Sequence, residues 1–191
     1  WTAPNGSAAA GRIALIGYNG RPLIKHCGLL LLSVAYWYLE NLKFMHPNST
    51  QGYTTYGVIG GIIDGTGPIL YNSIKNVISD LNGRDGVGLG AAVVINCEVR
   101  NTGGGAAGTG AGIGLDGYSG ITFGNYVDSV RGDCICDTTA GGVMGNITNN
   151  IIRSPGRDGI RVSGDTFGAS IISNTINGCT GDAIHVTDAT A

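Results

Sequence analysis

One short phrase recurs along the chain from residue 72 onward, and its spacing limits the possible folds more than any other feature. The phrase consists of an apolar residue, an Asn, a second apolar residue, a Gly- and Asp-rich turn, and another short apolar strand. The turns fall at positions 85, 111, 133, 158 and 182, so successive copies are 26, 22, 25 and 24 residues apart. Repeats of this length predict a solenoid, in which each repeat buries its apolar face against its neighbours.

The apolar residues within each repeat alternate with other residues, which is the period of a short β-strand. The repeats are too short for a strand–helix–strand crossover, and no stretch keeps a helical period. We therefore predict an all-β chain that forms a right-handed parallel β-helix with three parallel sheets and coils of roughly 20–29 residues. The residues expected in buried columns are Val87, Leu89, Ile113, Leu115, Ile135, Ile160, Val162, Ile184 and Val186.

The Asn of the repeated phrase predicts a ladder of side-chain amides that bond to the backbone of the bend and of the neighbouring coil. The expected ladder is Asn76, Asn125, Asn149 and Asn174, with Cys97 replacing Asn in the second coil. Asp in the following turns has a structural explanation as well, because Asp accepts local N–H bonds and Gly adopts positive φ.

The whole chain, residues 1–191, is predicted to be a single domain. Residues 1–71 form irregular first coils with a polar loop at 46–55, and residues 72–191 form the regular coils. The five residues after the last predicted strand are too few to cover an apolar solenoid end. We therefore expect a longer parent chain or a partner subunit.

Charge and hydropathy exclude two classes of partner. The net charge is −2 and no basic block is present, whereas nucleic-acid binding depends on clustered Lys and Arg. The longest apolar run, residues 27–39, is shorter than the about 20 residues that a membrane span needs. We expect neither a nucleic-acid partner nor a membrane span.

Three segments of the chain resemble a known superfamily. They are the Gly-Tyr-Asn-Gly and Arg-Pro-Leu-Ile stretch at 17–24, the strand at 36–44, and the repeated Asn-x-Ile and Asp-Gly-Ile-x-Val phrase. Together they resemble the pectin-lyase-like right-handed β-helix superfamily over most of the chain. The resemblance implies a polysaccharide partner and an extracellular or virion-associated location. Because spike proteins of this fold commonly trimerise, it also implies a homotrimer as one way to cover the solenoid end.

The catalytic signatures of that superfamily are incomplete in this sequence. The polygalacturonase set (Asn-x-Asp, Asp-Asp, Gly-His-Gly and Arg-x-Lys) and the epimerase Asp-Pro-His triplet are absent. The pectate lyase element Arg-x-Pro-x-x-Arg has a counterpart in Arg153-Ser-Pro155-Gly-Arg157 that is one residue too short. A coil turn that uses Pro for rigidity and Arg for solubility explains this segment better.

The second strand of the repeat supplies the candidate site. Its outward column is predicted to be Gly88, Gly114, Cys136, Arg161 and His185. Arg161 and His185 then lie on adjacent coils, so Arg161 could neutralise a uronate carboxylate while His185, tuned by Asp165, takes a proton. The alternative is an ordinary polar sheet face. Further contacts to a saccharide are predicted for Arg153, Arg157, Tyr126, Asp137 and Asp188.

These features leave three functions open. The first is a polysaccharide-binding module of a secreted or virion spike-like protein, the second a lyase or hydrolase acting on acidic polysaccharide, and the third a structural spacer. No cofactor is firmly implied. Calcium is the metal for which the strand-end aspartates offer ligands, although a column of turn aspartates usually binds none.

Overall fold

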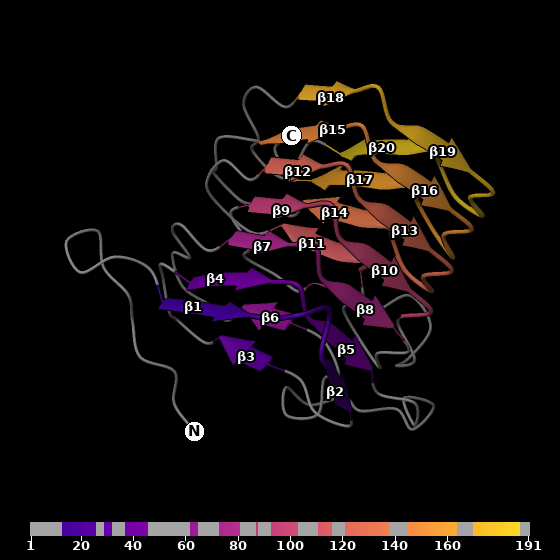
Figure 1. The fold of residues 1–191 in the computed structure, drawn as a ribbon. Helices are drawn as coiled ribbons and strands as arrows, with labels where there is room; N and C mark the ends of the chain where they lie inside the picture. The colour runs from indigo at the N-terminus through magenta and orange to yellow at the C-terminus, as the bar shows by residue number, and fades with distance from the viewer. Residues whose placement is uncertain are drawn as a thin grey trace.

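The structure is a computed structural model in which every regular element of the described part is a β-strand and every strand pair is parallel. Strands that follow one another along the chain lie in different sheets, and the coils stack from the N-terminal to the C-terminal end (Figure 1). One turn of this solenoid takes about 24 residues. The predicted all-β parallel β-helix with three sheets is confirmed. The described residues are 13–25, 29–31, 37–45, 62–64, 73–80, 87, 93–102, 111–115, 121–137, 145–163 and 170–187.

Two of the sheets contain seven described strands each. The first sheet is ordered β1 (Ile13–Ile16), β4 (Trp37–Glu40), β7 (Ser73–Lys75), β9 (Val93–Ile95), β12 (Ile121–Phe123), β15 (Asn146–Thr148) and β18 (Ser170–Ile172). The second is ordered β2 (Leu23–Lys25), β5 (Lys43–Met45), β8 (Ile78–Asp80), β10 (Glu98–Arg100), β13 (Tyr126–Asp128), β16 (Ile151–Arg153) and β19 (Thr175–Asn177). Along the chain, each strand of the first sheet that is followed by a corner leads into a strand of the second sheet.

The third sheet carries the candidate site. Its described strands are β3 (Leu29–Leu31) paired with β6 (Ile62–Asp64), and then β11 (Ile113–Leu115), β14 (Ile135–Asp137), β17 (Ile160–Ser163) and β20 (Ile184–Thr187). Val87 forms a further parallel bridge to Ile113. The described part of the chain contains no helix that is long and apolar enough to cross a membrane.

The core lies between the three sheets and consists of alternate strand residues. The predicted burial is confirmed for Val87, Ile113, Ile135, Ile160 and Val162. Each such side chain contributes about 1.5–3 kcal/mol when it is fully removed from water. Two further positions differ from the prediction, and two cannot be compared, because residue 89 and the side chain of residue 115 lie outside the described residues.

The prediction of burial is wrong for Ile184 and Val186, which are 47% and 68% exposed. Both lie on β20, the last strand in the order of the third sheet. Among the described strands, only β17 stacks on β20, so these side chains are covered from one side. Burial in a solenoid depends on having a coil on both sides, which the residue pattern of one coil does not reveal.

The corner between the first and second sheets contains two distinct columns. The first adopts the left-handed backbone conformation, which Asn tolerates better than most residues. Its members are Asn41, Asn76, Asn96, Gly124, Asn149 and Ser173. The second column follows one residue later and points into the core, with Val77, Cys97, Asn125, Asn150 and Asn174.

The predicted ladder is therefore partly wrong. Asn125 and Asn174 belong to it and Cys97 takes an Asn position, but Asn76 and Asn149 lie in the left-handed column. The missed member is Asn150. The error is a slip of one residue, because Ile74 pairs with Val94 and not with Ile95. A shift of one residue along a strand exchanges its inner and outer faces.

The ladder satisfies backbone groups of three coils. Asn150 Nδ2 donates to the Thr122 carbonyl at 3.0 Å and to Asn174 Oδ1 at 2.9 Å. Its Oδ1 accepts the Asn125 backbone N–H at 3.0 Å and the Asn125 amide at 2.9 Å. Asn125 in turn donates to the Val94 carbonyl at 3.0 Å. The amides thus bond both to each other and to the strands that precede them.

Two buried thiols give a test of this core. Burial raises the pKa of Cys97 to about 12 and also raises the pKa of Cys134. Because only the thiolate is nucleophilic, we expect iodoacetamide to modify half-buried Cys136 in the native chain while Cys97 and Cys134 react only after urea unfolding. Peptide mass spectrometry measures the three rates. Native labelling of Cys97 and Cys134 at the unfolded rate would contradict their placement.

Candidate ligand-binding face

The third sheet brings Arg161 and His185 together. Along this sheet, Gly114 pairs with Cys136, Cys136 with Arg161, and Arg161 with His185 as Cα partners. Their neighbours Ile135 and Ile160 are buried in the core, so the alternation of the strand turns this column outward. The spatial neighbourhood expected from the repeat is therefore present. Gly88 lies outside the described residues.

A column of aspartates lies in the turn that leads into these strands. The backbone N–H of Asp158 donates to Asp133 Oδ1 at 3.1 Å, and the N–H of Asp182 donates to Asp158 Oδ1 at 2.9 Å. Asp133 and Asp158 are buried. One carboxylate oxygen of each thus accepts an N–H of the next coil, whereas the sequence predicted bonds to local N–H groups. The second oxygen of each faces the outward column.

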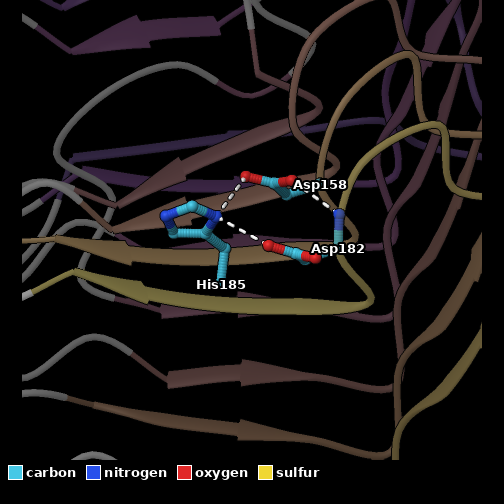
Figure 2. A group of neighbouring side chains, drawn as sticks. All are labelled: Asp158, Asp182 and His185. Atoms are coloured by element: carbon cyan, nitrogen blue, oxygen red, sulfur yellow. Dashed lines mark hydrogen bonds and ion pairs between the residues drawn. The ribbon is translucent and has the colours of Figure 1, made fainter.

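His185 lies between two of these carboxylates (Figure 2). Its Nδ1 is 3.0 Å from Asp182 Oδ2 and 3.4 Å from Asp158 Oδ2. A carboxylate only accepts hydrogen bonds, so Nδ1 carries the hydrogen whenever this contact is a hydrogen bond. The other ring nitrogen, Nε2, then points away from both carboxylates, as Figure 2 shows.

Two arginines face the remaining aspartate. Arg157 Nε is 3.9 Å from Asp133 Oδ1, and Arg161 Nη1 is 4.0 Å from Asp133 Oδ2. Arg161 is partly buried, and its Nε atom has no hydrogen-bond partner in the described part of the chain. The two arginines and the three aspartates of the column together carry a formal charge of −1 when His185 is neutral.

The structure places the other predicted contacts elsewhere. Tyr126 and Arg153 belong to the second sheet. The Tyr126 hydroxyl donates to Asp128 Oδ2 at 3.0 Å, and the Arg100 guanidinium lies 5.3 Å from the ring centroid, covering one face of the ring. Arg153 is the Cα partner of Asp128 on the neighbouring strand.

Three further predictions on this site cannot be compared with the structure. Asp165 and Asp188 lie outside the described residues, and the structure describes only the backbone of Asp137, on β14. In their place, Asp158 and Asp182 approach His185. The sequence held a signal for them, because an Asp precedes each outward residue by three positions in Asp133-x-x-Cys136, Asp158-x-x-Arg161 and Asp182-x-x-His185.

Comparison with known proteins does not assign this face. No protein-family model matches it, and neither the curated proteins nor the solved structures contain a significant match. The parallel β-helix fold is established by the strand pairing alone. The chemistry of the face has to be interpreted from its own residues.

Proposed function

We propose that this chain binds polysaccharide along the outer face of the third sheet, and that it belongs with the pectin-lyase-like β-helices. The binding face is defined here by Arg157, Arg161, Asp182 and His185. The observation that supports the proposal best is the register of β17 and β20, which sets Arg161 beside His185 on neighbouring coils. Adjacent strands are about 4.8 Å apart, which sets the spacing between Arg161 and His185 along the axis.

The mixture of groups on this face suits sugar hydroxyls. A hydroxyl both donates and accepts hydrogen bonds, guanidinium groups only donate, and carboxylates only accept. Arg161 and Asp182 together can therefore satisfy one hydroxyl pair. The face lies on the outside of a sheet, which fits a chain-like ligand better than a small molecule, which prefers a concave pocket. The formal charge of −1 favours a neutral over an acidic saccharide when no cation is bound.

The proposal predicts which side chains contribute to affinity. We expect Arg161→Ala to weaken saccharide binding by about 10-fold and His185→Gln by about 2- to 10-fold, since a hydrogen bond contributes about 1.5–3 kcal/mol when a charged group takes part and about 0.5–1.5 kcal/mol when none does. Isothermal titration against a panel of neutral and acidic oligosaccharides measures this. The matched control is Lys75→Ala, which removes a partly exposed cation on the first sheet and should not change the affinity.

Two results would contradict the proposal: no saccharide of the panel binds, or both variants bind a saccharide as tightly as the parent. The same samples test the alternative of a lyase or hydrolase. Such an enzyme would shorten the saccharide during incubation, and the products would be visible by chromatography. Binding without shortening supports the binding module.

A further inference from the structure

Three potential metal ligands converge at the C-terminal end of the aspartate column. They come from Asp158, Asp182 and His185, and one ligand atom of each lies within 4.8 Å of those of the other two. Figure 2 shows both carboxylates directed at the same ring nitrogen, one from the turn of the preceding coil and one from the turn of the same coil. The three side chains thus form one group and not a row.

A comparison with the preceding coil shows what this group lacks. There, the buried carboxylate of Asp133 faces two permanent cations, Arg157 and Arg161. One coil later, the Asp158 carboxylate, whose side chain is only 9% exposed, faces His185 in the position that Arg161 occupies below it. Asp182 adds a second carboxylate to the same nitrogen. Two carboxylates, one of them largely removed from water, therefore have a single imidazole as their partner. Unlike a guanidinium, an imidazole can be neutral.

The two ligand distances measured from His185 Nδ1 fit a first-row divalent ion. Zn–N and Zn–O bonds are about 2.0–2.2 Å long, so two ligands at angles of about 90–110° lie about 3.0–3.5 Å apart. The distances from His185 Nδ1 to the two carboxylate oxygens are 3.0 and 3.4 Å. The N–H of Asp182 holds the other oxygen of Asp158 at 2.9 Å, which fixes the orientation of this ligand as outer-shell hydrogen bonds do in metal sites.

We propose that Asp158, Asp182 and His185 form a binding site for a divalent transition-metal ion of the zinc class. Two carboxylates and an imidazole supply three ligands, and the exposed side of Asp182, which is 68% exposed, leaves room for water or a ligand in the remaining position. The imidazole favours zinc over calcium, which takes six to eight oxygen ligands. The site differs from the calcium ligands expected from the sequence at the strand ends.

The metal site stands independently of saccharide binding. If the proposed function is also correct, a bound dication changes the formal charge of the face from −1 to +1 and would favour acidic saccharides. This consequence rests on the proposed function. Titration with metal alone tests the site, and titration with saccharide in the presence and absence of metal tests the consequence, so that either can fail separately.

The test uses the 191-residue chain after treatment with a chelator. We expect isothermal titration to show one equivalent of Zn²⁺, and we expect His185→Gln and Asp182→Asn each to weaken binding by about 100-fold or more, because each removes a direct ligand. Neither side chain is buried, so both variants should keep the circular dichroism spectrum of the parent. Asp80→Asn, which removes the same charge from the second sheet, is the matched control and should bind Zn²⁺ normally.

Replacing Zn²⁺ with Co²⁺ identifies the ligands. Absorption without a thiolate charge-transfer band supports carboxylate and imidazole ligation, whereas such a band would show that cysteines bind the metal and would overturn the site. Equal Zn²⁺ affinity in the parent, His185→Gln and Asp182→Asn proteins would also overturn it. The same conclusion follows if Ca²⁺ binds as tightly as Zn²⁺ and the His185 variant binds Ca²⁺ unchanged.

Discussion

Replacing Asn150 with Ala is expected to lower the free energy of unfolding by about 3–4 kcal/mol, because the loss of one amide leaves several buried groups without partners. The Asn150 side chain bonds to the Thr122 carbonyl, to the Asn174 amide, and to both the backbone and the side chain of Asn125. Each buried donor or acceptor left unsatisfied costs about 1–3 kcal/mol. Equilibrium urea unfolding followed by circular dichroism measures the change.

The neighbouring residue provides the control. Asn149 is exposed and has a φ of 55°, so Asn149→Gly keeps the conformation that this position requires and should change stability by less than about 0.5 kcal/mol. Comparable losses in the two variants would show that the ladder does not run through Asn150. A stable Asn150→Ala protein would show that the corner can be rearranged without its amides.

The repeat period and the alternation of apolar residues were sufficient to predict the fold. Both properties are local, and a solenoid consists of local units that contact only their neighbours. The repeated phrase alone does not show which corner residues point into the core. Ile74 and Ile95 occupy equivalent places in the phrase but lie on opposite faces of their strands. Only the pairing of strands from different coils fixes this register. The exposure of Ile184 likewise depends on which strands stack beside β20.

The candidate site was predictable only in part. Aligning the last strand of each repeat places Arg161 beside His185, and the strand register agrees. Asp158 and Asp182 were interpreted as turn residues because one carboxylate oxygen of an Asp accounts for that role. The direction of the second oxygen depends on how one turn stacks on the next, which a single repeat does not contain. Tyr126 and Arg153 looked equally suitable, but they lie on another sheet.

Gly156 lies in the turn just before Arg157. It packs closely against the turn of the preceding coil. Its N–H donates to the Val130 carbonyl at 2.6 Å, and Arg157 N–H donates to the Gly132 carbonyl at 3.2 Å. A Cβ at position 156 would lie 2.7 Å from the carbonyl carbon and 2.9 Å from the Cα of Arg131, and would collide with the carbonyl oxygen as well. These are backbone atoms, which cannot move aside by changing a rotamer.

We therefore expect Gly156→Ala to lower the free energy of unfolding by about 3 kcal/mol, because the turn of one coil must lift away from the turn below it. The matched control is Gly178→Ala in the next coil. There the nearest atom to a new Cβ is 3.5 Å away, so only the positive φ of 75° opposes the substitution, at about 1–2 kcal/mol. Urea unfolding of both proteins separates the effects. If Gly178→Ala lowers the stability as much as Gly156→Ala, the loss at position 156 is due to backbone conformation and not to the contact between turns. The close stacking that places Arg157 near Asp133 would then lose its support.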